Sequence, residues 1–483
     1  DVASSNGGVP VIIDVLANDT DPLGPRSPST HPGSYTIEIV EPPVHGSVVI
    51  KDQKLTYLAD NIEGPVNIGY RINNGVNSNV ATLTINVTYN EFFGKAVVDK
   101  LGDENDGSTQ VGDVTLREAI SLVGSSNITG LAFSENLNDK IISLDNELGP
   151  LVINKDIVID GGNKVTISGG EETTIFKITS GNVEIKNITL KDGLSKGADG
   201  KRQGRFVEHA PGGGGAGMGG AIAIQSGNVV IDDVSFVNNK AIGGNGSNSS
   251  PTGNLDYAGG GGSSIFGGGA GRNSWGGSKD GRNGGFGGGG AGGLEYGGSS
   301  STSRNGYGGK GGFGGGGGGG AGGTYNCSGW PHTKRSRGLG GQGGLFAGKG
   351  SDGTAKPTCN RNFSARSGGG GGGAGLGGAI FIKSGELTVR NSSFKNSVAQ
   401  GGTGGSGNLG GEDGQGVGGA IFVYQDAALT ISNNVLSGSV SDVSSVTNND
   451  IYLMPTVEVG QSVLFGTNKF TSVANTQEET NII

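Results

Sequence analysis

The 483-residue chain is short of charge, proline and long apolar runs, and each shortage excludes a class of protein. Charged residues are only 16%, which excludes a charge-rich coiled coil, and a formal net charge of −9 argues against the basic footprint of a nucleic-acid-binding protein. That charge is also too mild for charge-driven disorder. With 14 prolines and no glycine at every third residue, the chain is not collagen. No apolar run approaches the ~20 residues of a membrane-spanning helix.

Cysteine is scarce as well. Cys327 and Cys359 are the only two, and both lie in the glycine-rich middle of the chain. Two thiols in a loop-rich stretch indicate one disulfide, and free or metal-bound thiols are the alternative. A bridge would close a loop of about 30 residues, could stabilise the fold by ~3 kcal/mol and would place the protein outside the cytosol. The first residues lack the basic and apolar regions of a signal peptide, so we expect a mature or trimmed chain.

Residues 1–90 contain short β-rich runs separated by turn signals, a spacing typical of a β-sandwich. PVIIDVLANDTDPLG (10–24) and HGSVVI (45–50) resemble bacterial cadherin-like or Ig-like surface repeats. The resemblance implies a spacer or adhesion module, and calcium as a ligand of the acidic run that holds Asp19 and Asp21. The alternative is that these two aspartates only form a turn.

A repeat dominates the second part of the chain. Each copy consists of an apolar residue, any residue, a second apolar residue, any residue, Asn or Asp, two further residues and a large apolar residue. The polar position of the four copies is Asn187, Asp233, Asn391 and Asn433. We expect each copy to be a strand of a parallel β-helix whose polar residues form a ladder from coil to coil. The last two copies lie 42 residues apart, which suggests two coils of about 21 residues.

GDVTLREAI (112–120) resembles the SLREAI element that opens a family of bacterial secreted right-handed β-helix proteins with adhesin-like repeats, and the likeness continues through residues 131–190. The cysteine usual before the motif is replaced here by Asp113-Val114. TLREAISLV has helical spacing and is expected to cap the open end of the β-helix.

These observations predict an all-β chain: an Ig-like β-sandwich at 1–90, a linker and β-helix cap at 91–130, and a right-handed parallel β-helix at 131–483 with glycine-rich lateral inserts. The largest insert spans 243–376, and all inserts leave the repeat at the same phase. We therefore expect them to lie side by side on one flank of the β-helix.

Glycine supplies 104 residues and concentrates in these inserts. Such runs can stay floppy, or they can pack as a bundle of polyproline-II-like helices anchored by aromatic residues at their ends. They resemble the glycine runs of phage tail-tip adhesins and glycine-rich antifreeze proteins. Aromatic and arginine side chains in the largest insert are candidates for contacts with a sugar or a partner protein, with plain packing as the alternative. They are Trp275, Tyr296, Tyr325, Trp330, Arg335 and Arg337.

The sequence carries no zinc, Walker, Rossmann or GxSxG motif. It predicts a non-enzymatic, extracellular protein, and first of all a self-associating subunit of a surface fibre or layer, joined head to tail through solenoid ends and sandwich edges. One alternative is a monomeric adhesin that binds a glycan or receptor through the glycine-rich flank. Another is a polysaccharide-active β-helix enzyme that uses Asp232 or Asp233.

Overall fold

The computed structural model divides the chain into two compact units, Asp1–Ala96 and Val97–Ile483. It describes residues 1–18, 35–73, 78–125, 128–201, 210–249, 259–270, 280–293, 306–322, 325–326, 333–334, 337–354, 366–406, 409–437, 439–441, 450–454, 464–465 and 473–475. Within these residues, no helix combines the length and apolarity needed to cross a membrane.

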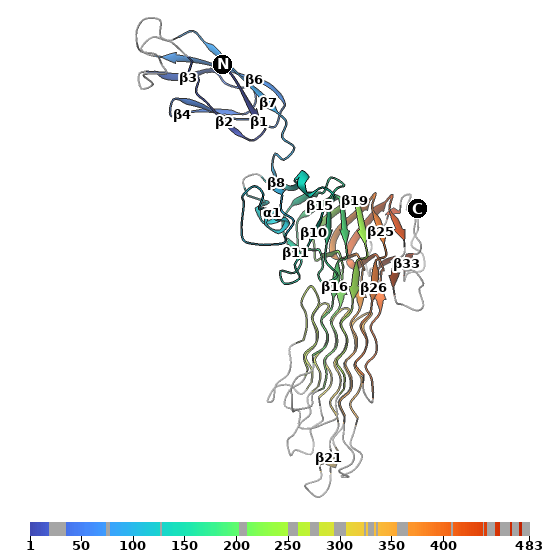
Figure 1. Cartoon of the computed structure of the whole chain (residues 1–483). Helices are drawn as coiled ribbons and strands as arrows, with labels where there is room; N and C mark the ends of the chain where they lie inside the picture. Colours follow the sequence, from blue (N-terminus) through green and yellow to red (C-terminus); the bar gives the residue numbers. More distant parts are fainter. Residues whose placement is uncertain are drawn as a thin grey trace. The chain divides into compact units, whose positions relative to one another are not determined.

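The first unit is a β-sandwich of two sheets (Figure 1). One sheet has the order β1 (Val2–Asn6), β7 (Ala81–Thr88), β6 (Gly64–Asn73) and β3 (Thr36–Glu41), and the other has the order β2 (Pro10–Ile13), β5 (Lys54–Leu58) and β4 (Ser47–Lys51). Side chains of both sheets share one core, in which Leu55, Tyr57, Ile68, Leu83 and Ile85 are fully buried. Buried and exposed residues alternate along β5 and β7, as expected for strands with one face on a core.

The second unit is a parallel β-helix with one α-helix near its start. Its strands pair in parallel from coil to coil. They are β8 (Lys95–Val98), β9 (Gly130–Phe133), β10 (Ile141–Ser143), β11 (Leu151–Ile153), β12 (Ile157–Asp160), β13 (Thr166–Ser168), β14 (Phe176–Ile178), β15 (Asn182–Lys191), β18 (Ile222–Ile224), β19 (Asn228–Val237), β24 (Ile380–Arg390), β25 (Ser393–Lys395), β28 (Ile421–Ser432), β29 (Val435–Ser437), β31 (Ile451–Leu453), β32 (Leu464–Phe465) and β33 (Val473–Asn475).

The register of these strands follows the sequence repeat. Ile185, Ile231, Val389 and Ile431 lie opposite one another in successive coils, and all four are buried. Because side chains alternate along a strand, the neighbouring apolar positions of the repeat face the same interior. The large apolar residue that ends the repeat also stacks: the rings of Phe236 and Phe394 are parallel, with centroids 4.5 Å apart.

The predicted coil length of about 21 residues is wrong for the last two copies. Val389 pairs directly with Ile431, so one coil separates Asn391 from Asn433. The coil is long because residues 401–415 leave the β-helix between β26 (Val398–Gln400) and β27 (Gly416–Val417). The prediction therefore mistook the glycine-rich insert for a second coil.

The expected cap is helix α1 (Leu116–Leu122), which buries Leu116, Ala119 and Ile120. A capping box joins Thr115 and Glu118 at its start. At its end, the Lys155 ammonium donates to three backbone carbonyls at 2.8–3.4 Å, where the helix dipole favours a cation.

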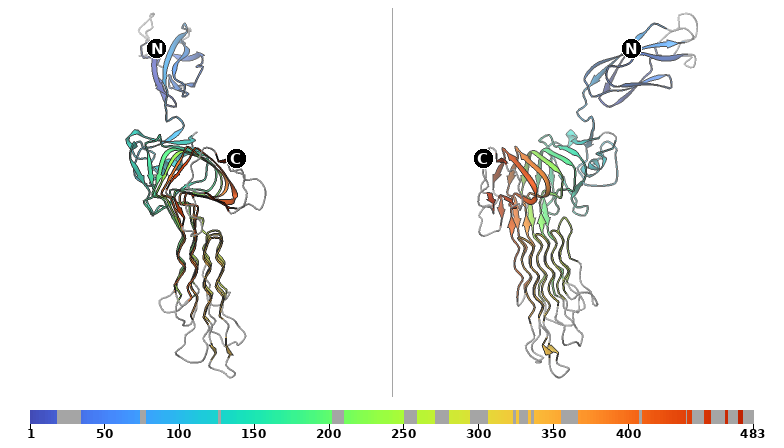
Figure 2. Two further views of the ribbon diagram at one scale, coloured as in Figure 1. Left: turned by 90° about the vertical axis from the view of Figure 1, so that its right-hand side faces the viewer. Right: turned by 180° about the vertical axis from the view of Figure 1, so that it is seen from behind.

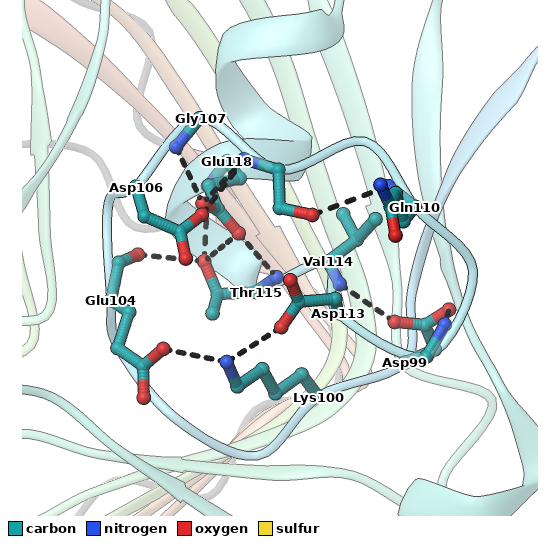
Figure 3. A network of polar contacts seen from close by, with 12 residues as sticks. Asp99, Lys100, Glu104, Asp106, Gly107, Gln110, Asp113, Val114, Thr115 and Glu118 are labelled. Carbon is teal, nitrogen blue, oxygen red and sulfur yellow. Dashed lines mark hydrogen bonds and ion pairs between the residues drawn. The ribbon is translucent and has the colours of Figure 1, made fainter.

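A loop folded around the start of α1 depends on the Glu118 carboxylate (Figure 3). This buried group accepts hydrogen bonds from the backbone N–H groups of Gly107, Ser108 and Thr115 at 2.9–3.2 Å. Burial opposes its ionisation, but the hydrogen bonds from Thr115 and Gly107 outweigh burial and lower the pKa of Glu118. The cap is therefore built on a carboxylate that must stay ionised.

Acid is expected to loosen the cap. The pKa of Glu118 is lower in the folded chain than the ~4.3 of an unfolded chain, so its stabilisation is present above that pH and is lost as the pH falls through the folded-state pKa. Amide exchange at Thr115 and Gly107, corrected for the intrinsic rate, should accelerate below about pH 4. A Glu118→Gln variant should exchange faster at neutral pH and lack the acid step. If the variant kept the same acid step, Glu118 would not be its cause.

Candidate functional site

The glycine-rich inserts form an ordered bundle on one flank of the β-helix (Figures 1 and 2), as the common phase of the inserts predicts. We call it the glycine-rich bundle; its described segments are 196–201, 210–217, 243–249, 259–270, 280–293, 306–322, 337–354, 366–376, 401–406 and 409–417.

Short parallel ladders link the bundle to the β-helix. Two ladders hold its base: β16 (Leu194–Lys196), β20 (Lys240–Ile242), β26 and β30 (Val440–Ser441), and then β17 (Gly217–Met218), β23 (Gly375–Leu376) and β27.

A three-residue period organises the bundle. In segment 368–375, every third backbone N–H donates to the same neighbour, at 2.8–3.3 Å. The three neighbours that accept these hydrogen bonds in turn are the segments 314–320, 409–415 and 244–247. A helix of three residues per turn directs its N–H groups in this way, which is the geometry of polyproline II. Of the two alternatives for these inserts, floppy runs or a bundle of polyproline-II-like helices, the structure shows the bundle.

Interior segments are surrounded on all sides. The carbonyls of 368–375 accept from three further segments, 402–405, 214–217 and 348–351. The segment 316–321 also donates to three neighbours and accepts from three others. Backbone groups that would be costly to bury unpaired are thus satisfied between segments, although the segments are neither α-helix nor ordinary strand.

Only glycine fits at the interior positions. A Cβ atom on Gly371 would overlap the carbonyl oxygen of Gly348, and one on Gly372 would overlap that of Gly402. A Cβ on Gly373 would overlap a third backbone, at Gly215. Successive residues face different neighbours, so no direction leaves room for a side chain.

Asparagine and aspartate side chains complete the outer layers of the bundle. The N–H of Thr403 donates to Asn245 Oδ1 at 2.9 Å, and the N–H of Ser406 donates to Asn248 Oδ1 at 2.8 Å. In another outer layer, the N–H of Lys310 donates to Asn283 Oδ1 at 2.8 Å. These functional positions were missed in the sequence. Their signal is an Asn or Asp repeated at a spacing of three within a glycine run.

Aromatic residues anchor the bundle to the β-helix. Phe266, Phe286, Phe313 and Phe346 lie at or beside the reversals of the chain at the base of the bundle, and their rings pack together with those of the last coils. The coils contribute a stack of Phe381, Phe422 and Tyr452, with centroids 5.2–5.5 Å apart. The Lys383 ammonium lies 4.6 Å from the centre of the Phe286 ring, a cation–π distance. The expected aromatic anchoring is confirmed.

The four ladder positions share a backbone conformation. Asn187, Asp233, Asn391 and Asn433 all have φ between 52° and 54°, the left-handed region that Asn and Asp tolerate best. Their side chains do not form one continuous chain. Asn433 Nδ2 donates to Asn391 Oδ1 at 3.4 Å.

The earlier ladder positions bond other residues. Asn391 donates to Asp232 at 2.8 Å, Asn187 donates to Asp160 at 2.9 Å, and Asp233 accepts from Asn163 at 3.1 Å. The predicted contact between ladder neighbours is therefore replaced by contacts with residues at other positions of the coil.

Two further sets of polar residues were missed in the sequence. Asp192, Asn238 and Asn396 each lie five residues after a ladder position. Asn238 Nδ2 donates to Asp192 Oδ1 of the preceding coil, and Asn396 Nδ2 donates to Asn238 Oδ1, both at 3.2 Å. Asn239 and Asn434 are almost fully buried, and each bonds backbone groups of an earlier coil through both ends of its amide. The signal for the first set is an Asn or Asp recurring at that fixed offset.

Asp232 and Asp233, the candidate carboxylates of a polysaccharide-active enzyme, both take part in contacts between coils. Asp232 Oδ2 lies 2.9 Å from Arg390 Nε of the next coil, and Asp233 accepts from Asn163. Lys186, Asp232 and Arg390 occupy opposed positions, so charges alternate along this row.

Several predicted site residues lie outside the part of the chain that the structure describes: Asp19, Asp21, Trp275, Tyr296, Cys327, Trp330, Arg335 and Cys359. Tyr325 belongs to β21 (Tyr325–Asn326), which pairs with β22 (Thr333–Lys334) at the end of the bundle away from the β-helix (Figure 1). Arg337 begins the next described segment, and its guanidinium lies 3.5 Å from Asp352. Among the described residues, no three His, Cys, Asp or Glu side chains are grouped to hold a metal ion.

Comparison with known proteins identifies the first unit alone. A family model described as a bacterial Ig domain matches residues 1–88, in agreement with the β-sandwich and with its resemblance to bacterial surface repeats. No curated protein and no solved structure matches the chain. Bacterial Ig domains are typical of surface or extracellular proteins, and this domain suggests a surface or adhesive role in general.

Proposed function

We propose that this chain is a non-enzymatic adhesin in which the glycine-rich bundle is a stiff arm that holds a ligand-binding end away from the β-helix. The observation that carries the proposal is the bundle itself, whose interior segments are each bonded to six neighbours. An arm bonded in this way loses little further conformational entropy when its end binds a ligand.

The residue types at the far end support this function. Tyr325 stands in β21 at that end, and the nearby sequence contains Trp330, Arg335 and Arg337. Aromatic and arginine side chains are enriched in binding hot spots. The first unit supports a surface location, and a glycan or a receptor protein on another surface is the expected ligand.

Cell binding tests this function. A full-length variant with Trp330→Ala, Arg335→Ala and Arg337→Ala is expected to bind cells or a glycan array at least tenfold more weakly than the unaltered protein, because hot-spot residues typically contribute about 2 kcal/mol each. The matched control changes Tyr89 and Lys51, which are exposed residues of the first unit, to alanine. Equal loss in the control, or undiminished binding by the triple variant, would assign binding to another part of the chain.

A further inference from the structure

The segments of the glycine-rich bundle lie side by side in rows, such as 197–200, 243–249 and 400–406, and each row is called a layer here. Within a layer, the backbone hydrogen bonds between neighbouring segments all have the same donor-to-acceptor direction. In each layer, the segment nearer the first coil of the β-helix donates to the segment nearer the last coil. The examples are 197–200 to 242–245, 243–249 to 400–406, 214–217 to 371–374, 369–375 to 409–415, and 308–311 to 339–342. A one-way order leaves two unlike edges. Outward N–H groups collect on the last segments, and outward carbonyls collect on the first.

Carboxylates cap part of the donor edge. Three of the N–H groups that would bond a next segment are those of Gly340, Lys349 and Gly404. Each donates instead to a side chain: Gly340 to Asp352 Oδ1 at 2.9 Å, Lys349 to Glu412 Oε2 at 3.2 Å, and Gly404 to Asp413 Oδ1 at 2.6 Å. These oxygens occupy the place that carbonyls of a further segment would take. The three capping residues belong to the last segments, 347–354 and 409–417.

The opposite edge offers the complementary groups. Among the described residues, no donor reaches the carbonyls of Asp199 and Gly261, which belong to first segments of their layers. On the donor edge itself, the exposed N–H groups of Gly410 and Asp413 have no backbone acceptor in the described part of the chain and could bond such carbonyls. One edge therefore matches the other in hydrogen-bond direction, and both consist largely of glycine segments.

We propose that the donor edge of the glycine-rich bundle is a latent interface for the acceptor edge of a second copy of this chain, and that Asp352, Glu412 and Asp413 keep it closed. With the carboxylates in place, their oxygens satisfy the edge amides, and the charges of Glu412 and Asp413 repel an approaching backbone carbonyl, as edge charges do in β-sheets. Without them, the edge matches a second copy in a head-to-tail contact that does not close on itself and so builds open chains. This interface is distinct from the solenoid ends and does not depend on the proposed ligand binding.

Sedimentation of a charge-removal variant tests the interface. Asp352→Ala, Glu412→Ala and Asp413→Ala together are expected to produce dimers and longer oligomers that grow with protein concentration, while the unaltered protein stays monomeric. The control removes three exposed carboxylates of the β-helix unit, Glu147, Glu386 and Asp426, and should stay monomeric. A folded variant that sediments like the control would overturn the proposal, and so would an unaltered protein that already polymerises through this edge.

Amide exchange gives a second test that needs no variant. In the unaltered protein, the capped amides of Gly340, Lys349 and Gly404 should exchange at least tenfold more slowly than the exposed amide of Gly410, after correction for intrinsic rates. Equal rates would mean that the carboxylates do not close the edge, whatever a destabilised variant does.

Discussion

Alanine in place of Gly372 is expected to unfold the middle of the glycine-rich bundle. The added Cβ would overlap the carbonyl oxygen of Gly402 and lie 2.9 Å from the backbone nitrogen of Gly414. Both contacts are with backbone, so no side-chain rotation relieves them. We expect a loss of about 3 kcal/mol in the free energy of unfolding of the bundle, at the upper end for overpacking. Amide exchange of segments 368–375 and 402–405 measures it.

Gly410 provides the matched control. Its added Cβ would have one neighbour, the carbonyl oxygen of Gly405 at 3.4 Å, which is an ordinary contact. Gly410→Ala should therefore change stability by less than about 0.5 kcal/mol, as at most surface positions. If the two alanine variants behaved alike, the close six-neighbour packing of the interior segments would be wrong.

Removing the Phe422 ring is expected to free the bundle from its base. This ring is fully buried, stacks on Phe381 and Tyr452, and meets Phe313 and Phe346 of the bundle. Phe→Ala substitutions in cores cost about 3–5 kcal/mol. Because the ring joins two parts, exchange should rise in the bundle segments 306–322 and 338–354 as well as in the coil.

Phe394→Ala separates anchoring from general stability. Phe394 is equally buried, but its stacking partner is Phe236 inside the β-helix. The Phe394→Ala variant should lower the melting temperature as Phe422→Ala does. Amide exchange in the bundle segments should stay near that of the unaltered protein. An equal rise of bundle exchange in both variants would show that the bundle depends on the whole solenoid and not on the aromatic stack.

The solenoid could be predicted because its repeat records the register directly. Ile185, Ile231 and Val389 carry the same kind of side chain at the same phase, and parallel pairing then requires them to stack. The helix at Leu116 was likewise predicted from its spacing, and the Thr115–Glu118 capping box is a further local signal that the structure shows. Both rest on local patterns that one segment carries by itself.

The bundle could be anticipated only as one of two alternatives. A run such as 368–373 is all glycine, so no side chain records which six segments surround it. That information lies in the neighbours, at positions such as Asn245 and Asn283, whose role appears only when the segments are placed together. The continuous ladder failed for a related reason: Asn391 has a carboxylate, Asp232, within reach, and a charged acceptor makes the stronger hydrogen bond.

Because successive N–H groups donate to three neighbours in turn, the pairing of the bundle depends on a fixed three-residue phase. Inserting one residue into segment 368–375 would turn every later N–H by about a third of a turn, toward a different neighbour, and break the pairing beyond that point. Inserting three residues keeps the phase and adds about 9 Å of length at ~3.1 Å per residue. Neighbouring segments that gain or lose whole triplets together can thus lengthen or shorten the arm while the β-helix at its base stays the same.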